Sequence, residues 1–110
     1  VTETVTAIAL GSGDMPVFAT PAMLALMENA AMLAVADELP EGCTTVGGQI
    51  ESSHLKPSKL GDVVCATAEV IKVDGKKIYF KVSAFSGDTL LGEGTHLRFI
   101  VDREKFLSRL

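Results

Sequence analysis

Residues 20–39 read TPAMLALMENAAMLAVADEL, and this segment is apolar over almost its whole length. Thr20 followed by Pro21 is typical of a helix start, because a threonine side chain can cap the first turn and proline lacks only an N–H that would stay unbonded there. The polar residues between Pro21 and Leu39 are Glu28, Asn29, Asp37 and Glu38. Since apolar residues lie almost all round, the pattern predicts a long helix that is enclosed on most sides.

The chain after residue 39 is rich in strand-forming residues. Pro40 and Gly42 end the helix. The runs expected to form strands are 43–55, 63–73, 77–86 and 90–101. Asp74-Gly75 and Gly87-Asp88 lie between successive runs and favour hairpin turns. These turns predict antiparallel neighbours.

The two ends of the chain are less distinctive. Residues 1–9, VTETVTAIA, place threonine at every second position, which predicts a further strand that residues 11–14, GSGD, would end. Residues 102–110 form either a short helical turn or an irregular end.

Together these elements predict an α+β fold, in which an antiparallel sheet of about five strands curls around one long central helix. A chain of 110 residues buries enough surface for one core, so residues 1–110 are expected to form a single domain. A sheet of this size leaves edge strands that a second copy could cover. We therefore expect a homodimer, with pairing of dimers into tetramers left open.

Composition excludes several classes of protein. Hydrophobic residues make up 47% of the chain and the net charge is −4, which argues against disorder and against a general nucleic-acid binder. The longest apolar run, residues 30–36, is too short to cross a membrane, and the first ten residues do not resemble a signal peptide, so we expect a cytoplasmic protein. Cys43 and Cys65 form no CxxC pair, which indicates reduced thiols and no metal site.

Charge is distributed unevenly along the chain. Residues 1–55 contain seven acidic residues and no Lys or Arg, whereas residues 56–110 contain all ten bases beside seven acids. The basic half could consist of solvated strand faces, or it could meet an anionic ligand such as a phosphorylated cofactor. The candidates for that contact are Lys56, Lys59, Lys76, Lys77, Arg98 and Arg103.

Glu28 and His54 are candidate catalytic residues. A carboxylate within an apolar helix is costly to bury, so Glu28 either marks a solvated edge together with Asn29 or lines a cleft as a general base or nucleophile. His54 ends the first strand after the helix, and in a straight strand it shares a face with Val46, Gly48, Ile50 and Ser52. His54 is either a structural hydrogen-bonding residue or a catalyst, and His96 has a weaker claim to either role.

Thr20 and the Gly47-Gly48 pair are further candidates. The Thr20 hydroxyl is expected first of all to cap the helix. Adjacent glycines in a strand mark a bulge or the close approach of a ligand, and a free amide there could bind a carbonyl oxygen. Thr20 and Glu28 lie eight residues apart, about 12 Å along a helix, so they cannot bond to each other directly. Either a cavity separates them or groups from two subunits meet.

At this point the chain resembles the hot-dog-fold thioesterases, and more closely the branch that contains the fluoroacetyl-coenzyme A thioesterase. The segments that carry this resemblance are residues 11–21 (GSGDMPVFATP), 26–28 (LME), 44–47 (TTVG), 54–57 (HLKP) and 61–62 (GD). The resemblance implies a helix enclosed by the sheet, a dimer, and an active site at the subunit interface. It also places the catalytic threonine, glutamate and histidine on Thr20, Glu28 and His54, and a substrate-binding glycine on Gly47.

The resemblance fails at one stretch. The fluoroacetyl enzyme shields its pocket with phenylalanines where this chain has residues 11–14, GSGD, and Phe18 is the nearby aromatic residue. A different, more open acyl pocket is therefore expected, with Gly47, Gly48 and Phe18 as the substrate-binding residues.

The resulting hypothesis is hydrolysis of a small acyl-coenzyme A thioester, with no cofactor besides the coenzyme A of the substrate. The same fold also hosts enoyl-coenzyme A hydratases and dehydratases, and a non-catalytic acyl-coenzyme A binding protein is a third alternative. Thiol release separates hydrolysis from the other two.

Overall fold

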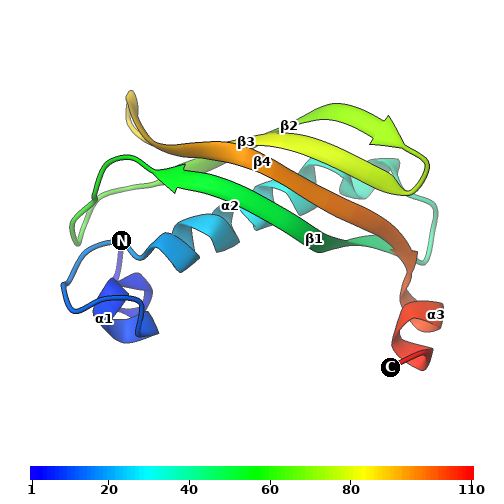
Figure 1. Ribbon diagram of the computed structural model, residues 1–110, viewed down its shortest axis with the longest axis horizontal. Coiled ribbons are helices and arrows are strands. Elements are labelled where there is room, and N and C mark those ends of the chain that lie inside the picture. The colour runs from blue at the N-terminus through cyan, green and yellow to red at the C-terminus, as the bar shows by residue number, and fades with distance from the viewer.

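Four antiparallel strands form one sheet in the order β1-β4-β3-β2 in the computed structural model, which describes residues 1–110. The strands are β1 (Cys43–His54), β2 (Cys65–Asp74), β3 (Lys77–Ser86) and β4 (Thr89–Asp102). The long helix α2 (Thr20–Val35), followed by the 3-10 turn η2 (Ala36–Glu38), lies along one side of this sheet (Figure 1). The predicted α+β architecture is confirmed, with four strands where about five were expected.

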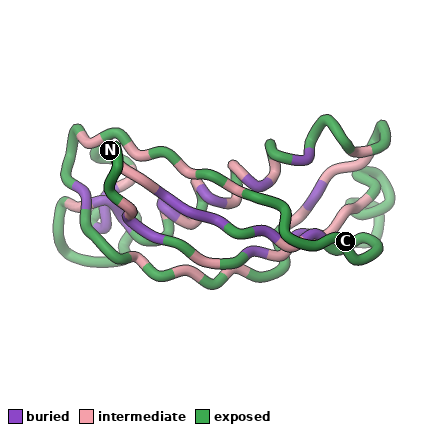
Figure 2. The backbone as a smooth tube through the Cα atoms, turned by 90° about the horizontal axis from the view of Figure 1, so that it is seen from above, coloured by how far each residue is buried: buried purple, intermediate pink, exposed green.

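The core forms between α2 and the sheet. Met23, Met27, Ala31 and Val35 recur every four residues and form the buried stripe of the helix. They pack against buried side chains of β3 and β4, namely Ile78, Phe80, Val82, Ala84 and Leu91. Figure 2 shows buried segments running through the middle of the molecule, with exposed turns at its ends.

The prediction that α2 is enclosed on most sides does not hold for a single copy of the chain. The side of the helix opposite the sheet stays open, and Leu33 there is 62% exposed. A sheet of four strands covers one side of a helix, whereas the helix sequence is apolar all round.

The predicted strand over residues 1–9 is wrong. The segment forms the 3-10 turn η1 (Glu3–Val5) and the short helix α1 (Ala7–Leu10). The Thr6 hydroxyl accepts a hydrogen bond from the Ala9 amide at 3.3 Å, and Gly11 ends α1 with a φ of 72°. These caps outweigh the strand preference of the threonines, and one isolated bridge between Thr6 and Phe18 is the segment's only β pairing.

Both hairpins are confirmed. Gly75 and Gly87 adopt φ values of 59° and 58° at the β2–β3 and β3–β4 turns, a conformation that glycine adopts without strain. The tail beyond β4 forms a helix, α3 (Arg103–Ser108), where the sequence left the choice open. The Asp102 carboxylate caps this helix by accepting from the Lys105 amide at 3.0 Å.

Strand β1 contains a bulge that changes which residues face the helix. Gly47 pairs with Arg98 and Gln49 pairs with Leu97, so Gly48 is the extra residue. A side chain on Gly47 would point at Glu28, whereas one on Gly48 would meet Phe99 on the other face of the sheet.

The bulge corrects the predicted face of His54. Because of the extra residue, His54, Ser52 and Ile50 share the inner face with Gly47 and Thr45, not with Gly48 and Val46. The expectation assumed a straight strand, and a one-residue shift exchanges the two faces.

Candidate active site

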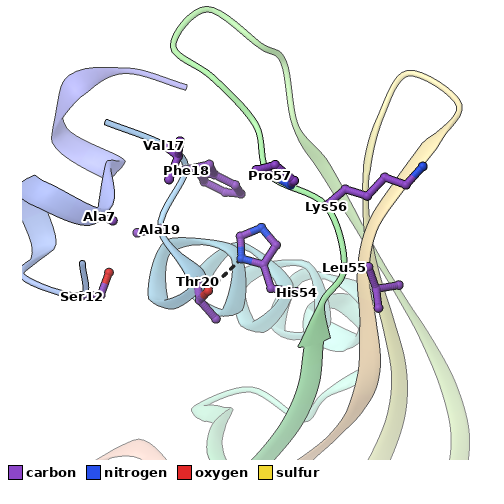
Figure 3. A pocket seen from close by; sticks show the side chains of 10 residues that line it. All are labelled: Ala7, Ser12, Val17, Phe18, Ala19, Thr20, His54, Leu55, Lys56 and Pro57. Atoms are coloured by element: carbon purple, nitrogen blue, oxygen red, sulfur yellow. Dashed lines mark hydrogen bonds between the residues drawn. The ribbon is translucent and has the colours of Figure 1, made fainter. Parts of the chain in front are cut away.

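Thr20 and His54 meet at one end of the molecule. The Thr20 Oγ1 lies 2.8 Å from the His54 Nδ1, which joins the first residue of α2 to the last residue of β1 (Figure 3). The expectation that Thr20 caps the helix is wrong. Ala19 occupies the cap position, and no side-chain cap bond forms. The threonine hydroxyl is therefore bonded to the imidazole instead of to the backbone.

The other imidazole nitrogen of His54 is buried without a partner. No protein group accepts from or donates to Nε2. The Phe18 ring lies edge-on to the imidazole, with 6.2 Å between the ring centroids. A polar atom left unbonded in this way is a place where a ligand, a water molecule or another chain can bind.

A cavity of about 290 Å³ adjoins this pair. Its lining combines the end of β1 and the loop that follows with the segment leading into α2, and consists of Ala7, Ser12, Val17, Phe18, Ala19, Thr20, His54, Leu55, Lys56 and Pro57. Lys56 extends away from the imidazole in Figure 3. The predicted residues Thr20, His54 and Phe18 thus belong to one pocket.

Glu28 lies two turns further along α2, over Gly47. Its side chain is 43% exposed, so it is neither fully solvated nor sealed in the core. A Cβ atom on Gly47 would lie 2.9 Å from the Glu28 Oε2, closer than real contacts allow. Any larger residue at position 47 would therefore displace the Glu28 carboxylate from this place.

Arg98 balances the charge of Glu28 from within the sheet. Its Nη1 lies 3.9 Å from the Glu28 Oε2. Burial lowers the pKa of Arg98, and the nearby Glu28 charge opposes that shift. A guanidinium stays protonated in proteins, so Arg98 keeps its positive charge beside Glu28.

A buried hydrogen-bond network holds Arg98 in place. Its Nε donates to the Thr45 Oγ1 at 2.8 Å, and its Nη2 donates to the Thr45 carbonyl at 2.9 Å. Its Nη1 lies 3.2 Å from the Nε2 of His96. Arg98 thus faces inward, although it was one of the candidates for contact with an anionic ligand. This network was not predicted from the sequence, and the alternation of β4 is the signal that could have placed Arg98 and His96 on one face.

The structure brings the predicted residues together as two separate groups. One group contains Thr20 and His54, and the other contains Glu28, Gly47 and Arg98. Eight helical residues separate Thr20 from Glu28 by about 12 Å. Seven strand residues separate Gly47 from His54 by about 23 Å. Within one chain the groups do not meet.

Gly48, which was expected to bind substrate, faces away from α2. Gly48 packs under the Phe99 ring on the outer face, and that contact by itself requires a glycine.

No cluster of three or more His, Cys, Asp or Glu side chains is arranged to hold a metal ion. Every helix is too short or too polar to span a bilayer.

Known proteins resemble this chain over most of its length. The family model described as fluoroacetyl-CoA-specific thioesterase matches residues 1–104. The fluoroacetyl-CoA thioesterase of Streptantibioticus cattleyicolor is 37% identical over 94 residues, which cover 86% of this chain and 68% of that protein.

Solved structures agree. A point mutant of the fluoroacetyl-CoA-specific thioesterase, in complex with fluoroacetate and CoA, matches with a TM-score of 0.92 and 33% identity over 99% of this chain and 90% of that one. A hot-dog-like protein from Thermanaerovibrio acidaminovorans matches with a TM-score of 0.88 and 27% identity, covering 99% and 81%. The predicted hot-dog fold is confirmed, and the chain belongs to the fluoroacetyl-CoA-specific thioesterase family.

Proposed function

We propose that the protein hydrolyses the thioester of small acyl-coenzyme A molecules, with Thr20, Glu28 and His54 as the catalytic residues. The observation that carries the proposal is the hydrogen bond between Thr20 and His54 beside a cavity, with the second imidazole nitrogen free to take a partner. Membership of the family supports a CoA thioester as the substrate, and a relative has been solved with fluoroacetate and CoA bound.

The complete site requires two copies of the chain. The two groups of residues are too far apart to act on one carbonyl within a chain, because about 12 Å of helix separates Glu28 from Thr20. Strand β1 is an edge strand whose only neighbour is β4, so its outer backbone groups are free to pair. The open apolar side of α2 at Leu33 also favours a covered, dimeric arrangement.

In this homodimer we place the β1 strands of two copies antiparallel to each other, about a two-fold axis perpendicular to the sheet, so that both α2 helices lie on the same face. The His54 end of one β1 strand then extends toward the Gly47 region of the other. Each Thr20–His54 group then lies beside a Glu28 from the other copy. A symmetric dimer of this kind contains two complete sites, and no tetramer is needed to form them.

The residues divide the chemistry of thioester hydrolysis between them. A thiolate leaving group resembles a cysteine thiolate, with a pKa of about 8.5, so most assistance is needed at the carbonyl carbon. Glu28 removes a proton from water, and the water oxygen bonds to that carbon. The Gly47 amide donates a hydrogen bond to the oxyanion. When the carbon–sulfur bond breaks, the proton that Glu28 took from water is passed through His54, which Thr20 orients, to the sulfur. The products are a carboxylic acid and free coenzyme A, and both side chains return to their starting protonation states.

A second route would use Glu28 as the nucleophile. Its oxygen would then bond to the acyl carbon, the carbon–sulfur bond would break and release the coenzyme A thiolate, and water would cleave the resulting anhydride. After a single turnover in ¹⁸O-labelled water, label in the Glu28 carboxylate would identify the anhydride route, because water then attacks the Glu28 carbonyl carbon of the anhydride.

The cofactor requirement and the cellular location complete the proposal. No cofactor is needed beyond the coenzyme A that the substrate carries. Cys43 and Cys65 are both free, which supports a reducing compartment, and we place the protein in the cytoplasm.

Thiol release from a panel of short acyl-coenzyme A substrates tests the proposal. We expect one free thiol for each molecule of carboxylic acid formed by the wild type. Loss of enoyl absorbance without thiol would indicate a hydratase or dehydratase, and saturable binding without turnover would indicate a binding protein. Either of these results would overturn the assignment as a thioesterase.

A further inference from the structure

His96 lies in β4 on the side of the sheet that faces α2, and it is 3% exposed. Its imidazole Nδ1 lies 2.7 Å from the Gln49 carbonyl oxygen, and its Nε2 lies 3.2 Å from the Arg98 Nη1. Neither contact involves the Thr20–His54 group. The ring plane is fixed by packing against Phe80, at 6.1 Å between centroids. His96 therefore connects the bulged region of β1 to the arginine that faces Glu28.

We propose that His96 is a positioning residue for the thioesterase reaction, a role that rests on the function proposed above. Its neutral imidazole holds Arg98 and the β1 bulge in the geometry that places the Glu28 carboxylate over Gly47. His96 acts through these groups and not on the substrate.

The hydrogen-bond partners determine the protonation of the His96 ring. A guanidinium has only donors, so the His96 Nε2 must accept from Arg98. A carbonyl oxygen has only lone pairs, so the His96 Nδ1 must carry the proton that it donates to Gln49. Both conditions hold only for a neutral imidazole protonated at Nδ1. An imidazolium would place two positive charges 3.2 Å apart in a buried setting.

The bond to Gln49 stabilises the bulge. Gln49 follows the extra residue Gly48, at the point where the pairing of β1 with β4 shifts by one residue. The His96 side chain donates to the Gln49 carbonyl there, which satisfies a backbone group at an irregular step of the ladder. The bulge directs Gly47 toward Glu28, so the bond from His96 to Gln49 stabilises the position of Gly47 opposite Glu28.

The bond to Arg98 fixes the direction of the guanidinium. Thr45 accepts from Nε and Nη2, and His96 accepts from Nη1. The same Nη1 faces the Glu28 Oε2 at 3.9 Å. Without the imidazole acceptor, Nη1 keeps no buried partner and the guanidinium can tilt away from the Glu28 carboxylate.

Two substitutions separate the two bonds. In His96→Asn, the amide nitrogen can occupy the place of Nδ1 and keep the bond to Gln49, but nothing replaces Nε2. In His96→Gln, the longer side chain can bring its oxygen to the place of Nε2 and keep an acceptor for Arg98. We expect His96→Asn to lower kcat about tenfold with little change in KM, the effect of one hydrogen bond to a charged group. His96→Gln should recover most of that loss. Wild-type kcat in folded His96→Asn would overturn the proposal. An equal loss of kcat in both variants, in proportion to their loss of thermal stability, would also overturn it, because the role of His96 would then be structural only.

The ring protonation supplies a readout that needs no substrate. Nitrogen NMR of the wild type should show a protonated, pyrrole-type Nδ1 and an unprotonated, pyridine-type Nε2 for His96 at neutral pH. An imidazolium or the opposite tautomer would overturn the proposed geometry. This result stands even if the wild type hydrolyses no acyl-coenzyme A, so failure of the positioning role and failure of the proposed function are distinguishable.

Discussion

Replacing Glu28 with glutamine is expected to lower kcat for acyl-coenzyme A hydrolysis by about 10²–10⁴-fold, the usual contribution of a general base. Glutamine keeps nearly the same shape over Gly47 but cannot accept the proton of the attacking water. KM should change much less, since the proposed role of the carboxylate is in the chemical step. Steady-state thiol release measures both constants.

A matched control uses Glu69→Gln, because Glu69 is exposed on β2 and belongs to neither half of the site. This variant should keep wild-type kcat and KM. Glu28→Gln should also keep most of its stability, because Arg98 retains its bonds to Thr45 and His96. A Glu28→Gln protein with kcat within twofold of the wild type would remove Glu28 from the mechanism.

His54→Ala is expected to produce a loss of similar size, about 10²–10⁴-fold in kcat, because Glu28 then has no imidazole to which it can pass the proton taken from water. Thr20→Val tests the contribution of the hydroxyl that bonds to the imidazole, for comparison with loss of the whole imidazole in His54→Ala. It keeps the shape of the side chain and removes only the hydroxyl that bonds to the imidazole, so about a tenfold loss is expected. Thr20→Ser should remain close to the wild type, since it keeps the hydroxyl.

The order of these effects is the informative outcome. If His54→Ala retained full activity, the Thr20–His54 bond would be structural. If Thr20→Val lost more activity than His54→Ala, the threonine would act on the substrate itself, and the assignment of His54 as the proton donor would be wrong. Circular dichroism of each variant confirms that it is folded.

Much of the fold could be predicted because local signals agree with the tertiary structure. The Thr20-Pro21 start and the apolar run set α2, and the glycines at 75 and 87 set the hairpins. The N-terminal prediction failed because capping by Thr6 decides the conformation of a short segment that forms a single β bridge. Alternation of threonine indicates a strand only when a neighbouring strand is present to pair with it.

The sequence suggested the members of the candidate site but not their geometry. Glu28 could be named as a candidate because a charge is costly in an apolar helix, and His54 because it ends a strand. The network of Thr45, His96 and Arg98 went unrecognised, since burial of an arginine depends on contacts between β1 and β4 that are distant in sequence. The bulge at Gly48 likewise decides which face His54 occupies.

Mixing two inactive variants tests most directly whether the site is shared between subunits. Glu28→Gln and His54→Ala are unfolded together, refolded in equal amounts, and assayed for thiol release, with native mass spectrometry to verify that mixed dimers form. Each mixed dimer should contain one site with an intact His54 and an intact Glu28 from opposite chains. Because half of the dimers are mixed and each restores one of two sites, about a quarter of wild-type activity is expected. Mixed dimers with no more activity than the separate variants would contradict a shared site.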